Sequence, residues 1–152
     1  VLTTDSRGNP TAYEHHGVGG EAVEKTITSK RDGGVLVISE VSTRNPPFAP
    51  FRFPANTLLF GDGGMAQLWF LGLGSAPRDV SYFEPGLWRE QHGRLSDAGP
   101  DSVTIEGKPV AATHLVLSGG LRQRDVWLDG QKRLLKVSLQ TSVVAVRTKL
   151  PQ

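Results

Sequence analysis

The sequence predicts a mainly β fold: a strongly curved antiparallel sheet of about 8–10 strands, a half-barrel or barrel, with one short helix plugging its concave side. The 152 residues include 18 Gly and 10 Pro spread along the chain, which indicate many turns and therefore many short strands. Residues 56–73 (NTLLFGDGGMAQLWFLGL) have an apolar density found nowhere else in the chain. This length suits one domain, so we expect residues 1–152 to form a single β half-barrel domain.

The helix is expected inside this apolar stretch. Three glycines lie between positions 61 and 64, and each disfavours a helix by about 1 kcal/mol relative to Ala. We therefore expect a short turn over residues 57–60 and a helix over about residues 64–71, with Asp62 as a candidate N-cap. A strand over the WFLGL run remains the alternative.

The part of the chain before this stretch predicts short strands and one irregular connection. The expected strands cover residues 2–4, 11–17, 21–30 and 35–41. The Asp32-Gly33 pair predicts a hairpin between the last two of them, because Asp-Gly suits the turns that match strand twist. Residues 45–54 (NPPFAPFRFP) contain four prolines, which remove four backbone donors, so we expect neither sheet nor helix there.

After the apolar stretch the sequence predicts a meander of hairpins. Strands are expected over residues 80–83, 88–95, 102–106, 110–117, 121–129, 132–139 and 143–146, with residues 96–100 as a loop. Residues 110–117 place apolar side chains at both odd and even positions, which predicts a strand covered on both faces. Asp129 falls at an expected turn, where Asp is favoured for backbone reasons alone.

Charge and composition exclude several classes of function. The net charge is +2 with interleaved signs, which does not indicate a nucleic-acid-binding surface. The chain has no Cys, and no apolar run approaches the roughly 20 residues that span a bilayer, so we expect no disulfide and no transmembrane segment. The chain begins at Val1 without a signal-peptide pattern, and we expect it to be a trimmed or processed piece of a longer precursor.

The polar residues carry no recognisable catalytic or metal motif. His15 and His16 are adjacent and point to opposite faces of a strand, and His92 and His114 lie far away in sequence, so no metal site is expected. We expect no cofactor and assign no catalytic residue. For acid/base chemistry the least implausible members are Glu84, Glu90 and His114.

The aromatic residues are the candidate ligand-binding residues. A curved sheet with a helix in its mouth can hold an apolar ligand, and large aromatic side chains would line one wall of that cavity. The residues that we assign to this wall are Trp69, Phe70, Tyr82, Trp88 and Trp127. The alternative interpretation is that they form the core of a domain otherwise short of large side chains.

Two segments give the chain a family resemblance. Residues 103–114 (VTIEGKPVAATH) and 124–139 (RDVWLDGQKRLLKVSL) resemble bacterial envelope domains of unknown function that are similar to the lipoprotein-carrier (LolA/LolB-like) half-barrel group. Residues 3–17 resemble their first hairpin, and residues 53–73 match the place where they insert a helical segment. The resemblance implies a periplasmic or secreted setting and an apolar ligand such as an acyl chain. Two departures are the absence of the usual initial strands and Gln131-Lys132-Arg133 in place of Gly-Arg.

The leading hypothesis is a protein that binds or shields a hydrophobic ligand, an acyl chain or a lipidated partner, in a bacterial envelope without enzymatic activity. One alternative is an accessory β module that docks onto the rest of a longer precursor or onto a second copy. The other is a small barrel enzyme that acts on an apolar substrate, with His114 or Glu90 as acid/base.

Overall fold

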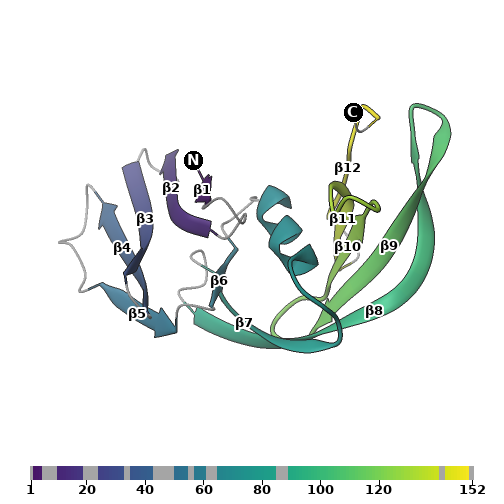
Figure 1. Ribbon diagram of the computed structural model, residues 1–152. Helices are drawn as coiled ribbons and strands as arrows, with labels where there is room; N and C mark the ends of the chain where they lie inside the picture. The colour runs from purple at the N-terminus through teal and green to yellow at the C-terminus, as the bar shows by residue number, and fades with distance from the viewer. Residues whose placement is uncertain are drawn as a thin grey trace. The chain divides into compact units, whose positions relative to one another are not determined.

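The computed structural model (Figure 1) describes residues 2–4, 10–18, 24–32, 35–42, 50–54, 57–60, 65–84, 89–140 and 143–150. The chain divides into two compact units, Val1–Thr57 and Leu58–Gln152. That the whole chain forms one domain stays a prediction. The described residues are mainly β, as the Gly and Pro content predicts.

The N-terminal unit contains a five-stranded antiparallel sheet. Its strands follow one another in sequence order: β1 (Leu2–Thr4), β2 (Pro10–Val18), β3 (Glu24–Asp32), β4 (Val35–Ser42) and β5 (Phe51–Pro54). The pairing of β3 with β4 that the Asp-Gly pair predicts is confirmed, with Asp32 opposite Val35. Ile38 of β4 is fully buried.

The prediction that residues 45–54 form no regular structure is wrong for their last four residues. Phe51–Pro54 are β5, which pairs antiparallel with β4 and places Pro54 opposite Val35. β5 is the last strand of its sheet. Proline lacks a backbone donor and is tolerated in an edge strand, where one side of the strand needs no partner.

The C-terminal unit contains a seven-stranded sheet and one 3₁₀-helix. The elements are β6 (Leu58–Leu59), η2 (Met65–Gly72), β7 (Arg78–Glu84), β8 (Arg89–Ile105), β9 (Lys108–Ser118), β10 (Arg124–Leu128), β11 (Leu134–Leu139) and β12 (Val143–Val146). Strands β7 to β12 form consecutive antiparallel pairs, and β6 pairs with β7 in parallel. The predicted turn over residues 57–60 is therefore wrong, because Leu58 and Leu59 form the edge strand β6.

β8 and β9 form a long hairpin, green at the right of Figure 1. Its turn is Glu106-Gly107, with φ of 51° and 74°, and two positive φ values are the geometry that matches strand twist. The predicted loop over residues 96–100 is wrong: these residues belong to β8. A bulge between Asp97 and Gly99 (φ 98°) lets the strand continue through Gly and Pro.

The helical segment is where the sequence predicts it, but it is a 3₁₀-helix of eight residues. It lies against β10 and β11. In the part of the chain that the structure describes, no other helix is present, and no helix is long and apolar enough to cross a bilayer. The described strands form two sheets, so the single sheet of 8–10 strands is wrong. β6, which follows the N-terminal sheet in the chain, pairs with β7 in parallel at the edge of the C-terminal sheet.

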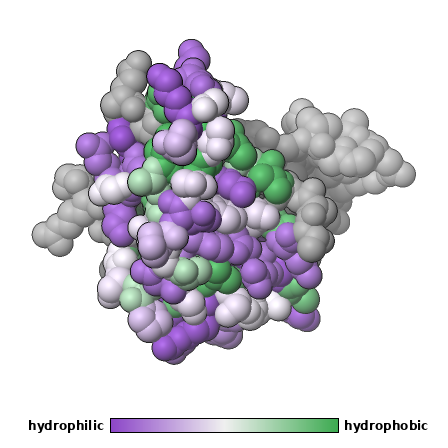
Figure 2. Space-filling view, turned by 90° about the vertical axis from the view of Figure 1, so that its right-hand side faces the viewer, coloured by the Kyte–Doolittle hydropathy of each residue, from purple (hydrophilic) through white to green (hydrophobic). Residues whose placement is uncertain are grey.

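Two apolar clusters cover the two faces of the C-terminal sheet. Val126 and Leu128 of β10 belong to the first cluster and Trp127, between them, to the second, and successive strand residues point to opposite faces. β9 contributes Leu115 and Leu117 to the first and Ala112 to the second, which confirms a strand covered on both faces. Figure 2 shows hydrophobic side chains as a band and smaller spots among hydrophilic ones on one side of the molecule.

Candidate apolar ligand site

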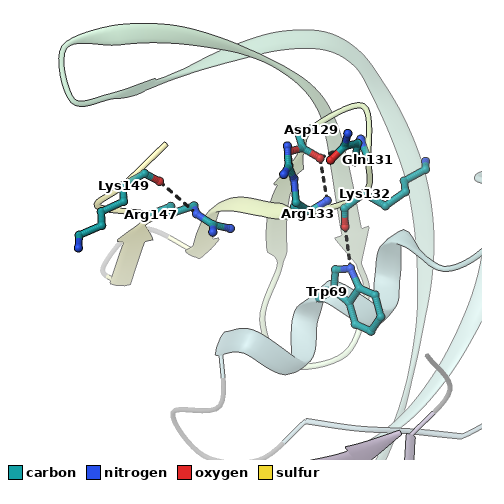
Figure 3. Close-up of polar contacts among 7 residues, drawn as sticks. All are labelled: Trp69, Asp129, Gln131, Lys132, Arg133, Arg147 and Lys149. Atoms are coloured by element: carbon teal, nitrogen blue, oxygen red, sulfur yellow. Dashed lines mark hydrogen bonds and ion pairs between the residues drawn. The ribbon is translucent and has the colours of Figure 1, made fainter. Parts of the chain in front are cut away.

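The 3₁₀-helix η2 is fixed to the sheet by polar contacts at its middle and at its end. In the middle, Trp69 Nε1 donates a 2.6 Å hydrogen bond to the carbonyl oxygen of Lys132 (Figure 3). At the end, Arg78 donates from Nη2 to the carbonyl oxygen of Leu71 (3.0 Å) and from Nη1 to that of Ser75 (2.9 Å). Arg78 thus satisfies a carbonyl that the end of η2 leaves unpaired, that of Leu71, and a second one in the segment that follows. Partial burial lowers the pKa of its guanidinium, which still stays charged at neutral pH.

The Lys132 carbonyl, which accepts the hydrogen bond from Trp69, belongs to a turn that Asp129 stabilises. Asp129 Oδ1 accepts from the backbone N–H groups of Gln131 (2.9 Å) and Arg133 (2.8 Å), and Oδ2 accepts from Arg133 Nε (2.7 Å). Lys132 adopts a positive φ of 62° in this turn. Burial alone would raise the pKa of Asp129, but the hydrogen bonds from Arg133 and Gln131 outweigh it and lower the pKa. The predicted turn role of Asp129 is therefore confirmed.

The surface between η2 and the sheet is apolar. Leu68 and Leu71 of η2 are 3% and 0% exposed, and both belong to the first apolar cluster. Trp69 packs against the same cluster and is half-buried. The other buried members of the cluster come from the sheet and from the residue that follows β6: Phe60, Val80, Tyr82, Leu95, Leu115, Leu117, Val126, Leu128 and Val137. An acyl chain placed here would exchange water for hydrocarbon contacts, at roughly 25 cal/mol per Å² of apolar area buried.

A buried ion pair lies on this same face. Arg124 alternates with Val126 and Leu128, and Glu84 alternates with Tyr82 and Val80, so both side chains point to the first cluster. Arg124 Nη2 donates to Glu84 Oε2 (2.7 Å), and the two side chains are 5% and 13% exposed. Arg124 Nη1 donates to the Tyr82 hydroxyl (3.0 Å). The guanidinium carbon also lies 5.4 Å from the centre of the Phe60 ring and 4.8 Å from that of Tyr82.

Gln91 adds a buried amide beside the ion pair. It is the cross-strand partner of Tyr82 and is 6% exposed. Its Nε2 has no hydrogen-bond partner among the residues that the structure describes. Gly120, with φ of 72°, packs over the site: a Cβ there would collide with the Tyr82 hydroxyl and lie 3.2 Å from Gln91 Oε1. The face that η2 covers thus combines hydrocarbon, a neutralised charge pair and an unsatisfied donor.

The opposite face carries a stack of Trp127 with its cross-strand neighbours. The His114 ring is parallel to the Trp127 ring at 4.3 Å, and Lys136 Nζ lies 4.1 Å from the Trp127 ring centre. His114 Nε2 is 2.9 Å from Asp125 Oδ1. Trp127 Nε1 donates to Asp101 Oδ2 (2.7 Å), and this hydrogen bond lowers the pKa of Asp101. The Trp127 indole is therefore in contact with the His114 ring and the Lys136 ammonium and is hydrogen-bonded to Asp101.

The structure brings some of the predicted aromatic residues together and separates others. Phe70 is buried and contacts Trp69 with ring centres 5.2 Å apart, and Tyr82 is fully buried in the cluster against which Trp69 packs. Trp127 lies on the other face of the sheet, so it does not share their wall. Trp88 lies outside the described residues. That these residues bind a ligand stays a prediction.

The candidate acid/base residues have other partners in the structure. His114 contacts Asp125 and Trp127, and Glu84 is paired with Arg124. Glu90 is half-buried on β8. In the described part of the chain, no three His, Asp or Glu side chains are grouped to hold a metal ion.

The sequence analysis missed Arg124 and Gln91. A signal for Arg124 was present, because it alternates with Val126 and Leu128 in a strand whose register buries all three. Gln91 gave a weaker one, since it alternates with Gly93 and Leu95, and only Leu95 marks that face as buried. A polar residue in register with core residues is a candidate for a paired or functional group.

No protein-family model matches the chain, and neither a curated protein nor a solved structure is significantly similar to it. The resemblance to the lipoprotein-carrier group therefore stays a prediction. Function has to be argued from the geometry of the site alone.

Proposed function

We propose that the C-terminal unit binds a hydrophobic ligand, an acyl chain or the acyl chain of a lipidated partner, on the sheet face that η2 covers, without enzymatic activity. The observation that carries this proposal is an eight-residue 3₁₀-helix whose leucines cover an apolar face. Runs of 3₁₀-helix longer than 3–4 residues are uncommon because their hydrogen-bond geometry is poorer than that of an α-helix. In this proposal η2 is the cover that a ligand displaces, because its backbone hydrogen bonds are weaker than those of an α-helix.

In this proposal the side chains of η2 occupy the ligand's place in the free protein. Leu68 and Leu71 fill the apolar face, and the Trp69–Lys132 hydrogen bond holds the helix down. A ligand chain replaces their contacts when the helix moves outward. Trp69, Phe70 and Tyr82 would then line the occupied site, with Trp88 as a further candidate and Trp127 on the opposite face.

The finer fold and the setting belong to the same proposal. We infer that the sheet of the C-terminal unit is a half-barrel with η2 as its plug, similar to the lipoprotein-carrier (LolA/LolB-like) group. We infer further that the protein works in a bacterial envelope, in the periplasm or after secretion. The helix against one apolar face and the consecutive antiparallel strands support the half-barrel. The envelope setting rests on the sequence resemblance alone.

Native mass spectrometry of the purified protein, with lipid extraction of the same sample, tests the proposal directly. We expect a stoichiometric apolar molecule, or saturable binding of a fluorescent acyl probe when that molecule has been removed. Trp69→Ala should weaken probe binding far more than it lowers the melting temperature. A clean mass without probe binding would contradict the proposal, and equal losses would make Trp69 a core residue only.

A second candidate function is supported by the edge strand β12. Its Val144 and Val146 are 57% and 43% exposed, and among the described strands β12 lies at the edge of its sheet and pairs only with β11. An exposed apolar edge can receive another strand, from a longer precursor or from a second copy. Sedimentation analysis of the wild type and of Val146→Lys tests this: a dimer that the substitution dissociates supports docking through β12, and a monomer of both removes the second copy.

A further inference from the structure

The site has a polar end whose chemistry indicates which acyl compounds it takes. Gln91, Tyr82 and Arg124 lie at this end of the face that η2 covers, next to the apolar cluster to which Tyr82 belongs. A ligand with its chain under η2 would bring its head group to these residues. This step rests on the proposed function.

The charge at the polar end is already balanced. Arg124 is paired with Glu84 at 2.7 Å, and both side chains are nearly buried. A second carboxylate placed beside this pair would have to leave water next to the Glu84 carboxylate, and like charges at close range in a low dielectric repel strongly. A free fatty acid is therefore a poor ligand for this end of the site.

The hydrogen-bonding capacity at the polar end is not balanced. Gln91 Nε2 is a donor on a side chain that is 6% exposed, and it has no partner among the described residues. Buried donors are nearly always paired, and an unpaired one is unfavourable until an acceptor arrives. An uncharged carbonyl oxygen supplies that acceptor without adding charge.

We propose that the site selects acyl chains bearing an uncharged carbonyl, an ester or an amide, over free fatty acids, and that Gln91 Nε2 donates to this carbonyl. The ester would come from a glycerolipid and the amide from an acylated polypeptide. Gln91 acts here as a specificity-determining residue. Tyr82 and Arg124 form the wall against which the carbonyl lies.

Competition against a fluorescent acyl probe tests this inference with three ligands of equal chain length. They are palmitate, monopalmitoylglycerol and an N-palmitoyl peptide amide. We expect both neutral compounds to bind about tenfold more tightly than palmitate, because repulsion from Glu84 keeps a carboxylate out of the polar end and only a neutral carbonyl then receives the Gln91 hydrogen bond. The tighter of the two neutral compounds then indicates whether a lipid or an acylated polypeptide is the source.

Gln91→Leu is the deciding variant. We expect it to lose the preference for neutral compounds while it still binds the probe, and to melt no lower than the wild type, because it removes an unsatisfied buried donor. Gln123 is an exposed glutamine that directly precedes β10. Gln123→Leu is therefore the matched control and should keep the preference. Equal affinities of palmitate and the ester for the wild type would overturn the inference and leave the proposed function standing. Absence of all binding would overturn the proposed function itself.

Discussion

Trp69 Nε1 and the carbonyl oxygen of Lys132 lie 2.6 Å apart and join the 3₁₀-helix to the turn between β10 and β11 (Figure 3). The two residues are 63 positions apart in the chain. The contact depends on a turn in which Lys132 has a positive φ and Asp129 accepts three hydrogen bonds. The position of η2 on the apolar face therefore depends on the conformation of the turn between β10 and β11.

Trp69→Phe tests whether this hydrogen bond acts as a latch, that is, whether it holds η2 on the apolar face. The substitution keeps an aromatic ring but removes the indole donor, so we expect a loss of about 1 kcal/mol in the free energy of unfolding. We also expect faster uptake and release of an acyl probe, measured by stopped-flow fluorescence. Trp127→Phe is the matched control, since it removes an indole hydrogen bond on the opposite face. Similar acceleration in both variants would contradict a latch at Trp69.

Acid is expected to weaken the turn that holds the latch. The folded-state pKa of Asp129 lies below its ordinary value of about 3.9, so its stabilisation is fully present above about pH 5. It is lost as the pH falls through the ordinary value toward the folded-state pKa. Denaturation of the wild type and of Asp129→Asn between pH 7 and pH 3 measures this. The two stability curves should converge at low pH, and parallel curves would show that the ionisation of Asp129 does not stabilise the fold.

The Arg124–Glu84 pair is expected to be costly to break from one side. Glu84→Gln leaves the buried guanidinium without its counter-charge, which should lower the free energy of unfolding by about 3–5 kcal/mol. The double variant Glu84→Gln, Arg124→Met removes the stranded charge and should recover much of that loss. A double-mutant cycle with urea denaturation measures the coupling. Additive effects would show that the two residues stabilise the fold independently.

Gly120 is expected to tolerate no side chain, because it packs on Tyr82. Gly120→Ala places a Cβ against the Tyr82 hydroxyl at a φ of 72°. Gly107→Ala is the control: its φ is 74°, and nothing lies within 4 Å of an added Cβ. Both variants share the backbone strain of about 1 kcal/mol. A further loss in Gly120→Ala alone, seen in its melting temperature, would measure the contact with Tyr82, and equal losses would deny it.

The local patterns predicted most of the elements for clear physical reasons. The strands predicted over residues 110–117, 121–129 and 132–139 overlap β9, β10 and β11, since apolar residues and turn residues mark a strand within its own segment. The strands missed, β5 and β6, and the loop misplaced at 96–100 depend on pairing partners. Pro54 is tolerated because β5 is an edge strand, and Gly99 is tolerated because β8 has a bulge there. Neither the edge position nor the bulge can be read from the local sequence.

The sequence by itself determined that this chain is mainly β, where its apolar helical segment lies, and that Asp129 occupies a turn. These features follow from backbone preferences within a few residues. Only the tertiary structure decided that Tyr82 and Trp127 lie on opposite faces, that Arg124 meets Glu84, and that Gln91 is left with an unpaired donor. Strand register and order set these relationships, because they bring together residues that are distant in sequence, and register is fixed by the packing of the whole sheet.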